Sequence, residues 1–162
     1  MRKEKIGQLS KEQALAKAAS LCSLSEHCSS QIQEKLLSWG VSDKDTEEII
    51  NHLVEENFID DIRFSRAYCH DKFCYNHWGR TKIRQMLRHL RLSDGEIAEG
   101  MKAIPDESYD ETLMDVLRAK DRTLRETDMY QRKGKLVHHL LSRGFEMGIV
   151  LDAVDEYFHD MP

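Results

Sequence analysis

Two neighbouring carboxylates, Asp60 and Asp61, precede a stretch that holds two arginines and two aromatic residues. Adjacent carboxylates suggest acid–base catalysis or a bound cation. Successive residues on a helix point about 100° apart, however, so these two do not form a shared-proton pair by themselves. We expect one of them to cap a helix that begins near Ile62, because negative charge is favoured at that helix end. The pair is therefore interpreted as architectural.

Cysteine and histidine residues form a second candidate, a metal site that would use Cys69, His70, Cys74 and His77. Cys69 and Cys74 are five residues apart, which places them about 140° from each other on a helix. The four cysteines of the chain form no Cys-x₂-Cys pair of the kind found in zinc sites, and no nucleophile–base motif occurs. We expect no metal ion, no cofactor and no catalytic residue.

The segment 78–92, WGRTKIRQMLRHLRL, is the strongest candidate for a binding surface. Its apolar residues recur at helical spacing and predict a buried stripe, which leaves the cations exposed. These cations, the last three of which share one helix line, are Arg80, Lys82, Arg84, Arg88 and Arg91. A second basic zone, diluted by acids, consists of Arg118, Arg122, Arg125, Arg132, Lys133 and Lys135. The pattern favours contact with phosphates or an acidic partner over an ordinary solvated face.

The composition points to a helical protein. Of the 162 residues, 40% are hydrophobic, 33% are charged and 7% are aromatic, and glycine and proline together number ten. A β-rich fold would need more turn residues and more alternation than this. The net charge is −5, but the acids are concentrated in segments 42–61 and 145–162, apart from the basic segments.

Neither a membrane span nor a secretory signal is apparent. No apolar run reaches the roughly 18 residues that a span requires. The first residues, MRKEKIGQLSKEQ, are charged and lack an apolar segment. We therefore expect a cytoplasmic protein with reduced cysteines and no contact with a membrane.

An internal repeat organises the chain. Ile32, Ile83 and Leu136 align at spacings of 51 and 53 residues. The pattern continues four residues later with Leu36, Leu87 and Leu140, and nine residues later with Val41, Leu92 and Phe145. Directly before Val41, Leu92 and Phe145 stand Gly40, Arg91 and Gly144, respectively. Two of the three copies therefore carry a glycine typical of a helix C-terminus. Three units of one kind are predicted.

Each unit reads as three helices resembling a helix-turn-helix pair with one helix added. In the first unit, the predicted helices begin after Ser10 and span 29–39 and 43–56. In the second unit they span 62–73 and 79–91, and a third begins after Ser93. In the third unit they span 106–126 and 146–158, and between these a helix begins after Asp128. The predicted repeats are 10–58, 59–105 and 106–158, with tails at 1–9 and 159–162. The fold class is therefore all-α, with three tandem three-helix repeats in an elongated, curved molecule.

The middle repeat resembles the RecX family, regulators of the recombinase RecA. The resemblance rests on the pair at 60–61 followed by Arg63, Phe64, Ser65 and Tyr68, and then on Gly79, Lys82, Ile83 and Leu87. The first repeat is similar through Ile32, Lys35, Leu36 and Gly40, but has Ser25, Cys28 and Gln31 where the family usually has Arg, Ser or Thr, and Glu.

The resemblance implies a non-enzymatic, monomeric protein that lies along the groove of the RecA–DNA filament. Such proteins inhibit strand exchange, ATPase and coprotease activity, and bind single- and double-stranded DNA weakly and mostly without sequence preference. The residues at 60, 61, 63, 64, 68 and 79 would be structural.

Three other functions remain open from the residues alone. A transcriptional regulator could use the 79–91 helix to recognise DNA. In a purely structural helical adaptor, charge reversal at Arg84, Arg88 and Arg91 would leave DNA and recombinase assays unchanged. An enzyme has the least support from the sequence.

Overall fold

The computed structural model describes residues 8–161, which form α-helices and no strand. The helices are α1 (Lys11–Leu24), α2 (Ser29–Ser38), α3 (Asp43–Glu55), α4 (Asp61–Cys74), α5 (Arg80–His89), α6 (Asp94–Met101), α7 (Asp106–Asp121), α8 (Met129–Ser142) and α9 (Met147–His159). Residues 1–7 of the predicted N-terminal tail and residue 162 lie outside this range. Among the described helices, none is long and apolar enough to span a bilayer.

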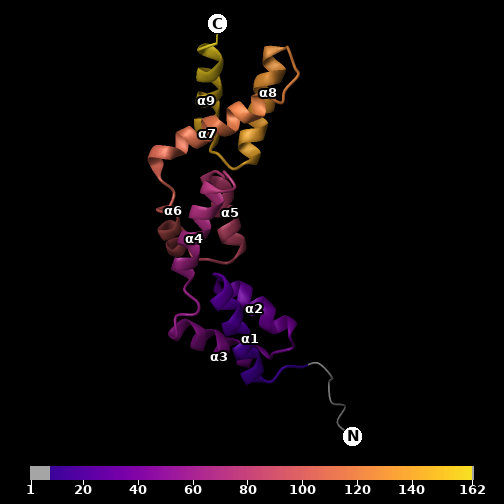
Figure 1. Cartoon of the computed structure of the whole chain (residues 1–162), viewed down its shortest axis with the longest axis vertical. Coiled ribbons are helices and arrows are strands. Elements are labelled where there is room, and N and C mark those ends of the chain that lie inside the picture. Colours follow the sequence, from indigo (N-terminus) through magenta and orange to yellow (C-terminus); the bar gives the residue numbers. More distant parts are fainter. Residues whose placement is uncertain (1–7, 162) are drawn as a thin grey trace.

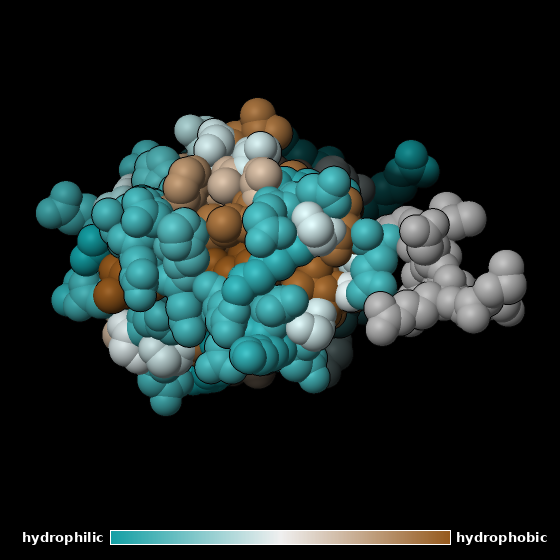
Figure 2. Space-filling view, turned by 90° about the horizontal axis from the view of Figure 1, so that it is seen from below, coloured by the Kyte–Doolittle hydropathy of each residue, from teal (hydrophilic) through white to brown (hydrophobic). Residues whose placement is uncertain are grey.

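The helices are arranged as three groups of three in an elongated molecule (Figure 1). Helices α1–α3 lie at the N-terminal end, α4–α6 in the middle and α7–α9 at the C-terminal end. The all-α fold with tandem three-helix repeats is confirmed. Seen from the N-terminal end, the surface is mostly hydrophilic, with apolar side chains visible between the polar ones (Figure 2).

Local capping residues set most helix starts. Ser10 and Ser93 form capping boxes with Gln13 and Glu96, and Asp128 accepts a hydrogen bond from the Gln131 amide at 2.9 Å. These three starts agree with the predicted ones, because the signal for a cap lies within four residues of sequence.

Two predicted helix ends were wrong. Helix α7 ends at Asp121 and not near residue 126, because the Thr123 hydroxyl donates to Lys120 O at 2.7 Å and the chain turns there. Helix α5 ends at His89, and Arg91 lies beyond it with a φ of 62°. The aligned residues of the other repeats are the glycines at 40 and 144, with φ of 82° and 94°, so Arg91 adopts a conformation that favours glycine.

The buried apolar residues form two clusters. One lies in the first repeat and includes Ile32, Leu36 and Leu53. The other runs without interruption through the second and third repeats, from Phe64 to Phe158. The second and third repeats therefore share a core, and the first has its own.

The middle helices of the three repeats meet end to end. The N-terminus of α5 contacts the C-terminus of α8, and the N-terminus of α2 contacts the C-terminus of α5. Helix ends carry amides and carbonyls without partners inside the helix, and opposite partial charges. Placing the N-terminus of one helix against the C-terminus of the next gives these groups partners and brings opposite partial charges together. It also arranges α8, α5 and α2 one after another along the molecule (Figure 1).

Main-chain hydrogen bonds close the junction between the second and third repeats. The Gly79 amide donates to Arg143 O at 2.8 Å, and the Thr81 amide donates to Gly144 O at 3.0 Å. A Cβ at Gly79 would lie 2.3 Å from Gly144 O, so the two chains approach this closely only because residue 79 is glycine.

Tyr109 fills the same junction from α7. Its ring packs against Phe73 and Phe145, with centroid distances of 5.7 and 5.5 Å. Its hydroxyl accepts a hydrogen bond from the Arg80 amide at 3.0 Å and donates one to Glu146. Burial and the bond to that carboxylate raise the pKa of Tyr109, so the phenol stays protonated.

Side chains close the junction between the first and second repeats. The Ser29 amide donates to Asp61 Oδ1 at 2.8 Å, and the Ser30 hydroxyl donates to Leu90 O at 2.5 Å. At the rim, Arg91 lies 3.8 Å from Glu34. Cys28, the N-cap of α2, is buried in the cluster of the second and third repeats.

Candidate interface for nucleic acid or a protein partner

The motif around residue 60 lies where the first repeat meets the second. Asp60 Oδ1 accepts a hydrogen bond from the Arg63 amide at 3.0 Å and caps α4, as predicted for one member of the pair. Asp61 accepts from the start of α2. The Arg63 guanidinium donates to Glu26 at 2.7 Å, which ties α4 to the α1–α2 turn. The side chains of this motif are thus occupied with one another.

Below the cap, Phe64 is buried and Tyr68 is half-buried, with ring centroids 5.6 Å apart. Gly79 is buried against the third repeat. Of the described residues, no three His, Cys, Asp or Glu side chains lie close enough together to hold a metal ion. The thiol of Cys69 is buried beside Met101, and burial raises its pKa to about 11, so it is not a reactive thiolate.

Arg80 lies inside the junction of the second and third repeats. It donates to Asp106 at 2.6 Å and to Glu146 at 3.4 Å, and its guanidinium stacks 3.8 Å from the centre of the Tyr109 ring. Only 22% of its side chain is exposed. These contacts hold it in place, and little of it remains for a partner.

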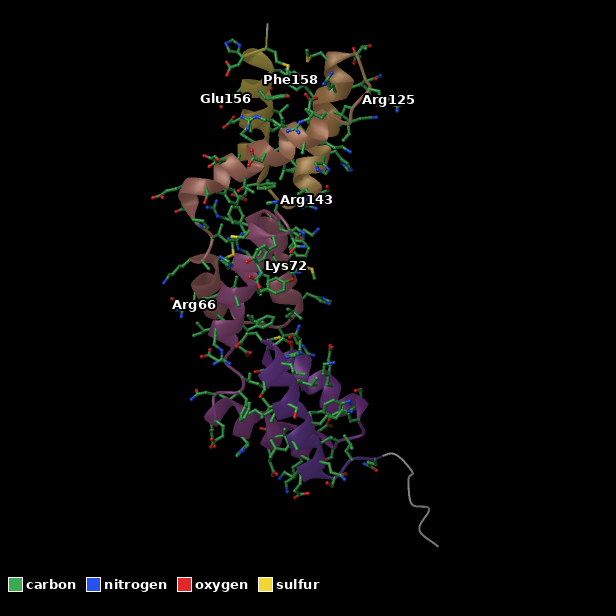
Figure 3. All side chains as sticks on the ribbon, viewed as in Figure 1. Arg66, Lys72, Arg125, Arg143, Glu156 and Phe158 are labelled. Atoms are coloured by element: carbon green, nitrogen blue, oxygen red, sulfur yellow. The ribbon has the colours of Figure 1, made fainter. Side chains whose placement is uncertain are left out.

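Lys82 belongs to a cluster of cations and aromatic rings beside that junction. Lys82 Nζ lies 4.2 Å and Lys72 Nζ 4.8 Å from the centre of the Trp78 ring, and Lys72 also lies 5.4 Å from the Tyr68 ring. Figure 3 places Lys72 in the middle repeat. Such pairs contribute about 0.5–1 kcal/mol each at exposed sites, and the lysines stay within reach of an anion.

The remaining cations of α5 differ in their surroundings. Arg84 is half-buried and Arg88 is exposed, and neither pairs with a carboxylate in the described part of the chain. Arg91 is exposed, and its pairing with Glu34 at 3.8 Å is long. Arg84 and Arg88, which are four residues apart, share one face of the helix.

The cations of the third repeat fall into two sets. Four have carboxylate partners: Arg118 with Asp115, Arg132 with Asp121, Lys133 with Asp155, and Lys135 with Glu126. Arg122 and Arg125 are exposed and have no such partner in the described range. In Figure 3 Arg125 points outward from the loop between α7 and α8. This loop therefore presents two free guanidinium groups.

Sequence reasoning missed three residues that lie between α7 and α8. Lys120, His139 and Arg143 line a shared hollow there. In the sequence, Lys135, His139 and Arg143 recur every four residues, which is the spacing of one helix face. That spacing could have identified them, but only with knowledge that Lys120 of α7 lies opposite.

Tandem three-helix repeats with exposed basic faces define a class of elongated helical binding proteins. Residues 60–101 match the family description "RecX, second three-helix domain", and residues 107–154 match "RecX, third three-helix domain". Together these matches cover more than half of the chain, and the chain belongs to the RecX family of regulatory proteins.

Named relatives agree with this assignment. The chain is 31% identical over 128 residues to regulatory protein RecX of Clostridium botulinum (strain Eklund 17B / Type B), covering 78% of this chain and 59% of that protein. It is 28% identical over 144 residues to RecX of Prosthecochloris aestuarii, covering 88% and 92%. The chain thus spans about six tenths of the Clostridium relative and nearly all of the Prosthecochloris one.

Solved structures support the fold. The crystal structure of RecX from Lactobacillus salivarius superposes with a TM-score of 0.80 at 17% identity, covering 92% of this chain and 97% of that one. A second RecX crystal structure gives a TM-score of 0.78 at 22% identity, covering 90% and 73%. At such identities the likeness establishes the arrangement of helices and no more.

Proposed function

We propose that this protein regulates a RecA-type recombinase by binding along the recombinase–DNA filament and reducing its strand exchange, ATPase and coprotease activity. The observation that carries the proposal is the set of cations without carboxylate partners on an elongated scaffold, Arg84, Arg88, Arg122 and Arg125. Free guanidinium groups suit phosphates and acidic protein surfaces alike, and a filament offers both.

Monomeric binding at an extended filament groove fits the head-to-tail line of α8, α5 and α2. A line of helices makes an elongated surface, over which several weak contacts can act together. DNA contacts through such charges would be sequence-independent, with single and double strands both bound weakly.

The geometry disfavours the transcriptional regulator. A recognition helix contacts base edges through its N-terminal residues. At the start of α5 the amides of Gly79 and Thr81 donate to the end of α8, and the Arg80 amide donates to Tyr109 of α7. They could enter a DNA groove only if the second and third repeats separated.

The test is DNA-dependent ATPase of the recombinase at rising concentrations of this protein. Wild-type protein is expected to inhibit at micromolar excess. The variant Arg84→Glu/Arg88→Glu should inhibit at least tenfold less, because each reversed charge turns an attraction into a repulsion.

The matched control is Lys35→Glu/Lys44→Glu, which makes the same charge change at exposed positions of the first repeat. It is expected to inhibit almost as well as wild type. Absence of inhibition by the wild-type protein refutes the proposal. Equal loss in both double variants would instead mean that total charge, and not this face, governs binding.

A further inference from the structure

The space between α7 and α8 forms a hollow surface, and Lys135 of the second basic zone is among the residues that line it. Two adjoining hollows of about 560 and 520 Å³ share Lys120 and His139 as lining residues. We name their common surface the α7–α8 groove, and it is formed chiefly by Lys120, Gly134, His138, His139, Ser142 and Arg143.

The charges of this groove do not cancel. Its two acids each have a basic partner, since Glu126 accepts from Lys135 through Oε1 and Asp115 lies 3.5 Å from Arg118. Glu126 Oε2 is buried and has no hydrogen-bond partner. Lys120 has no carboxylate partner in the described range, and Arg143 is held only by the carbonyl oxygen of Asn76. Figure 3 shows Arg143 where α8 meets the second repeat. Two positive charges therefore face the groove without a counter-ion.

The shape of the groove suits a chain of anions. Lys135, His139 and Arg143 are four residues apart on α8, which spaces them about 6 Å from one another along one face. Gly134 leaves the wall open, because nothing lies within 4 Å of where its Cβ would be. Lys135 is paired with Glu126, which leaves His139 and Arg143 on this face and Lys120 opposite them. Several donors along an open wall match a polymer that carries one charge per unit better than a single carboxylate.

We propose that the α7–α8 groove binds the phosphodiester backbone of a nucleic-acid strand, with Lys120 and Arg143 as the phosphate contacts and His139 between them. This deepens the proposed function by naming a site for the nucleic-acid component. The site lies on the third repeat, apart from Arg84 and Arg88 of α5.

His139 makes the binding sensitive to pH. The charged or titratable groups around it are Lys120 and Asp115 on α7, His77 before α5, Glu126 in the loop, and Lys135, His138 and Arg143 on α8. Burial, followed by the charges of Lys120, Arg143 and His138, lowers the pKa of His139, so the free groove holds a neutral imidazole at pH 7. A bound phosphate favours the protonated ring, so affinity should rise as the pH falls from 7.5 to 6.

The test is fluorescence anisotropy with a labelled single-stranded oligonucleotide and the full chain, without recombinase. Lys120→Gln/Arg143→Gln is expected to bind roughly 25-fold more weakly at 0.1 M salt, with the slope of log K against log salt reduced by about 1.4, since each single-strand phosphate contact contributes about 0.7. The control Lys35→Gln/Lys44→Gln, with the same change in charge, should leave both quantities unchanged.

A second variant guards against misfolding, because Arg143 also supports the junction. Gly134→Glu improves helix propensity and meets no neighbour, yet it places a negative charge in the groove. It should abolish binding while the circular dichroism spectrum is retained. His139→Gln should show a smaller change in affinity between pH 7.5 and pH 6 than the wild type.

Wild-type affinity in Gly134→Glu would overturn the proposal, as would an unchanged salt slope in the double variant. Unlabelled duplex should compete too, although less well than a single strand, whose flexible backbone can follow the groove. Stronger competition by polyglutamate than by either nucleic acid would show that the groove accepts an acidic protein segment instead. Because no recombinase is present, failure here leaves the proposed regulation of its ATPase standing, and the reverse also holds.

Discussion

The two junctions of this molecule use equivalent positions of the repeat but different chemistry. Between the second and third repeats, backbone amides donate directly to backbone carbonyls, and one apolar core runs across the boundary. Between the first and second repeats, a carboxylate and a serine hydroxyl make the corresponding contacts, and the two cores are separate except at Cys28.

This difference shows what a glycine at the start of a middle helix achieves. Gly79 aligns with Cys28 in the repeat, and at the junction next to Cys28 side chains make the contacts that the main chain makes next to Gly79. We infer that the second and third repeats behave as one body that carries the basic surfaces, while the first repeat can open separately.

The largest effect is expected for Gly79→Ala. The new methyl group would overlap Gly144 O, Gly144 C and Phe145 N at 2.3–2.4 Å, and relieving the overlap would break both main-chain hydrogen bonds of the junction. The free energy of unfolding should fall by about 3 kcal/mol. Urea unfolding followed by circular dichroism measures this.

Gly95→Ala is the matched control, since nothing lies near its Cβ in α6. It should leave the protein as stable or raise the free energy of unfolding by up to about 1 kcal/mol. If Gly79→Ala and Gly95→Ala were equally stable, the close approach at Gly79 would not contribute to the free energy of unfolding.

Tyr109→Phe tests the same junction without a clash. Loss of the hydroxyl leaves the Arg80 amide without an acceptor and removes a donor to Glu146. Because both groups are partly buried, the free energy of unfolding should fall by about 2 kcal/mol. Tyr130→Phe changes a side chain that is 86% exposed and should have almost no effect. Thermal unfolding of the two variants side by side would reveal whether the hydroxyl matters.

Low pH should destabilise the second and third repeats through protonation of Asp121. The hydrogen bond from Arg132, and then that from the Tyr157 hydroxyl, lowers the pKa of this carboxyl. Its stabilisation is therefore present above the ordinary aspartate pKa of about 3.9 and is lost as the pH falls through the lower, folded value.

Asp121→Asn should reduce stability at pH 7 by about 1.5 kcal/mol and remove this part of the acid dependence. The control Asp152→Asn changes an exposed aspartate of α9. Unfolding measured from pH 2 to pH 7 compares them. A profile for Asp121→Asn that runs parallel to wild type would show that other carboxylates govern acid unfolding.

The smallest effect is expected at the other junction. Asp61→Ala removes the acceptor for the Ser29 amide. The free energy of unfolding should fall by about 1 kcal/mol, mainly for the first repeat. Limited proteolysis should then cut faster in the linker at residues 56–60. The control is Asp94→Ala. Asp94 is the first residue of α6, as Asp61 is of α4, but it makes no bond across a junction, so the variant should be cleaved at the wild-type rate.

The sequence predicted local features well and distant ones poorly. The caps at Ser10, Ser93 and Asp128 depend on neighbours within one turn, and they were correctly placed, as was a cap by one member of the pair at 60–61. The repeat also followed from the sequence, because the hydrophobic spacing is periodic.

The environment of each cation could not be predicted in this way. Arg80 looked like the other cations of α5, yet its partners, Asp106 and Glu146, lie 26 and 66 residues away in sequence. The partners of Asp121 could not be predicted either, since it bonds to Arg132 and Tyr157 on two other helices. Pairing of this kind depends on how helices pack, which spacing along one helix does not reveal.

Native-state hydrogen exchange in low concentrations of urea tests the central claim most directly. If the second and third repeats are one body, amides of α4–α9 should share a single opening free energy, and those of α1–α3 should exchange through a lower one. Exchange of all described helices with one common free energy would contradict the account, and so would opening of α7–α9 before α4–α6.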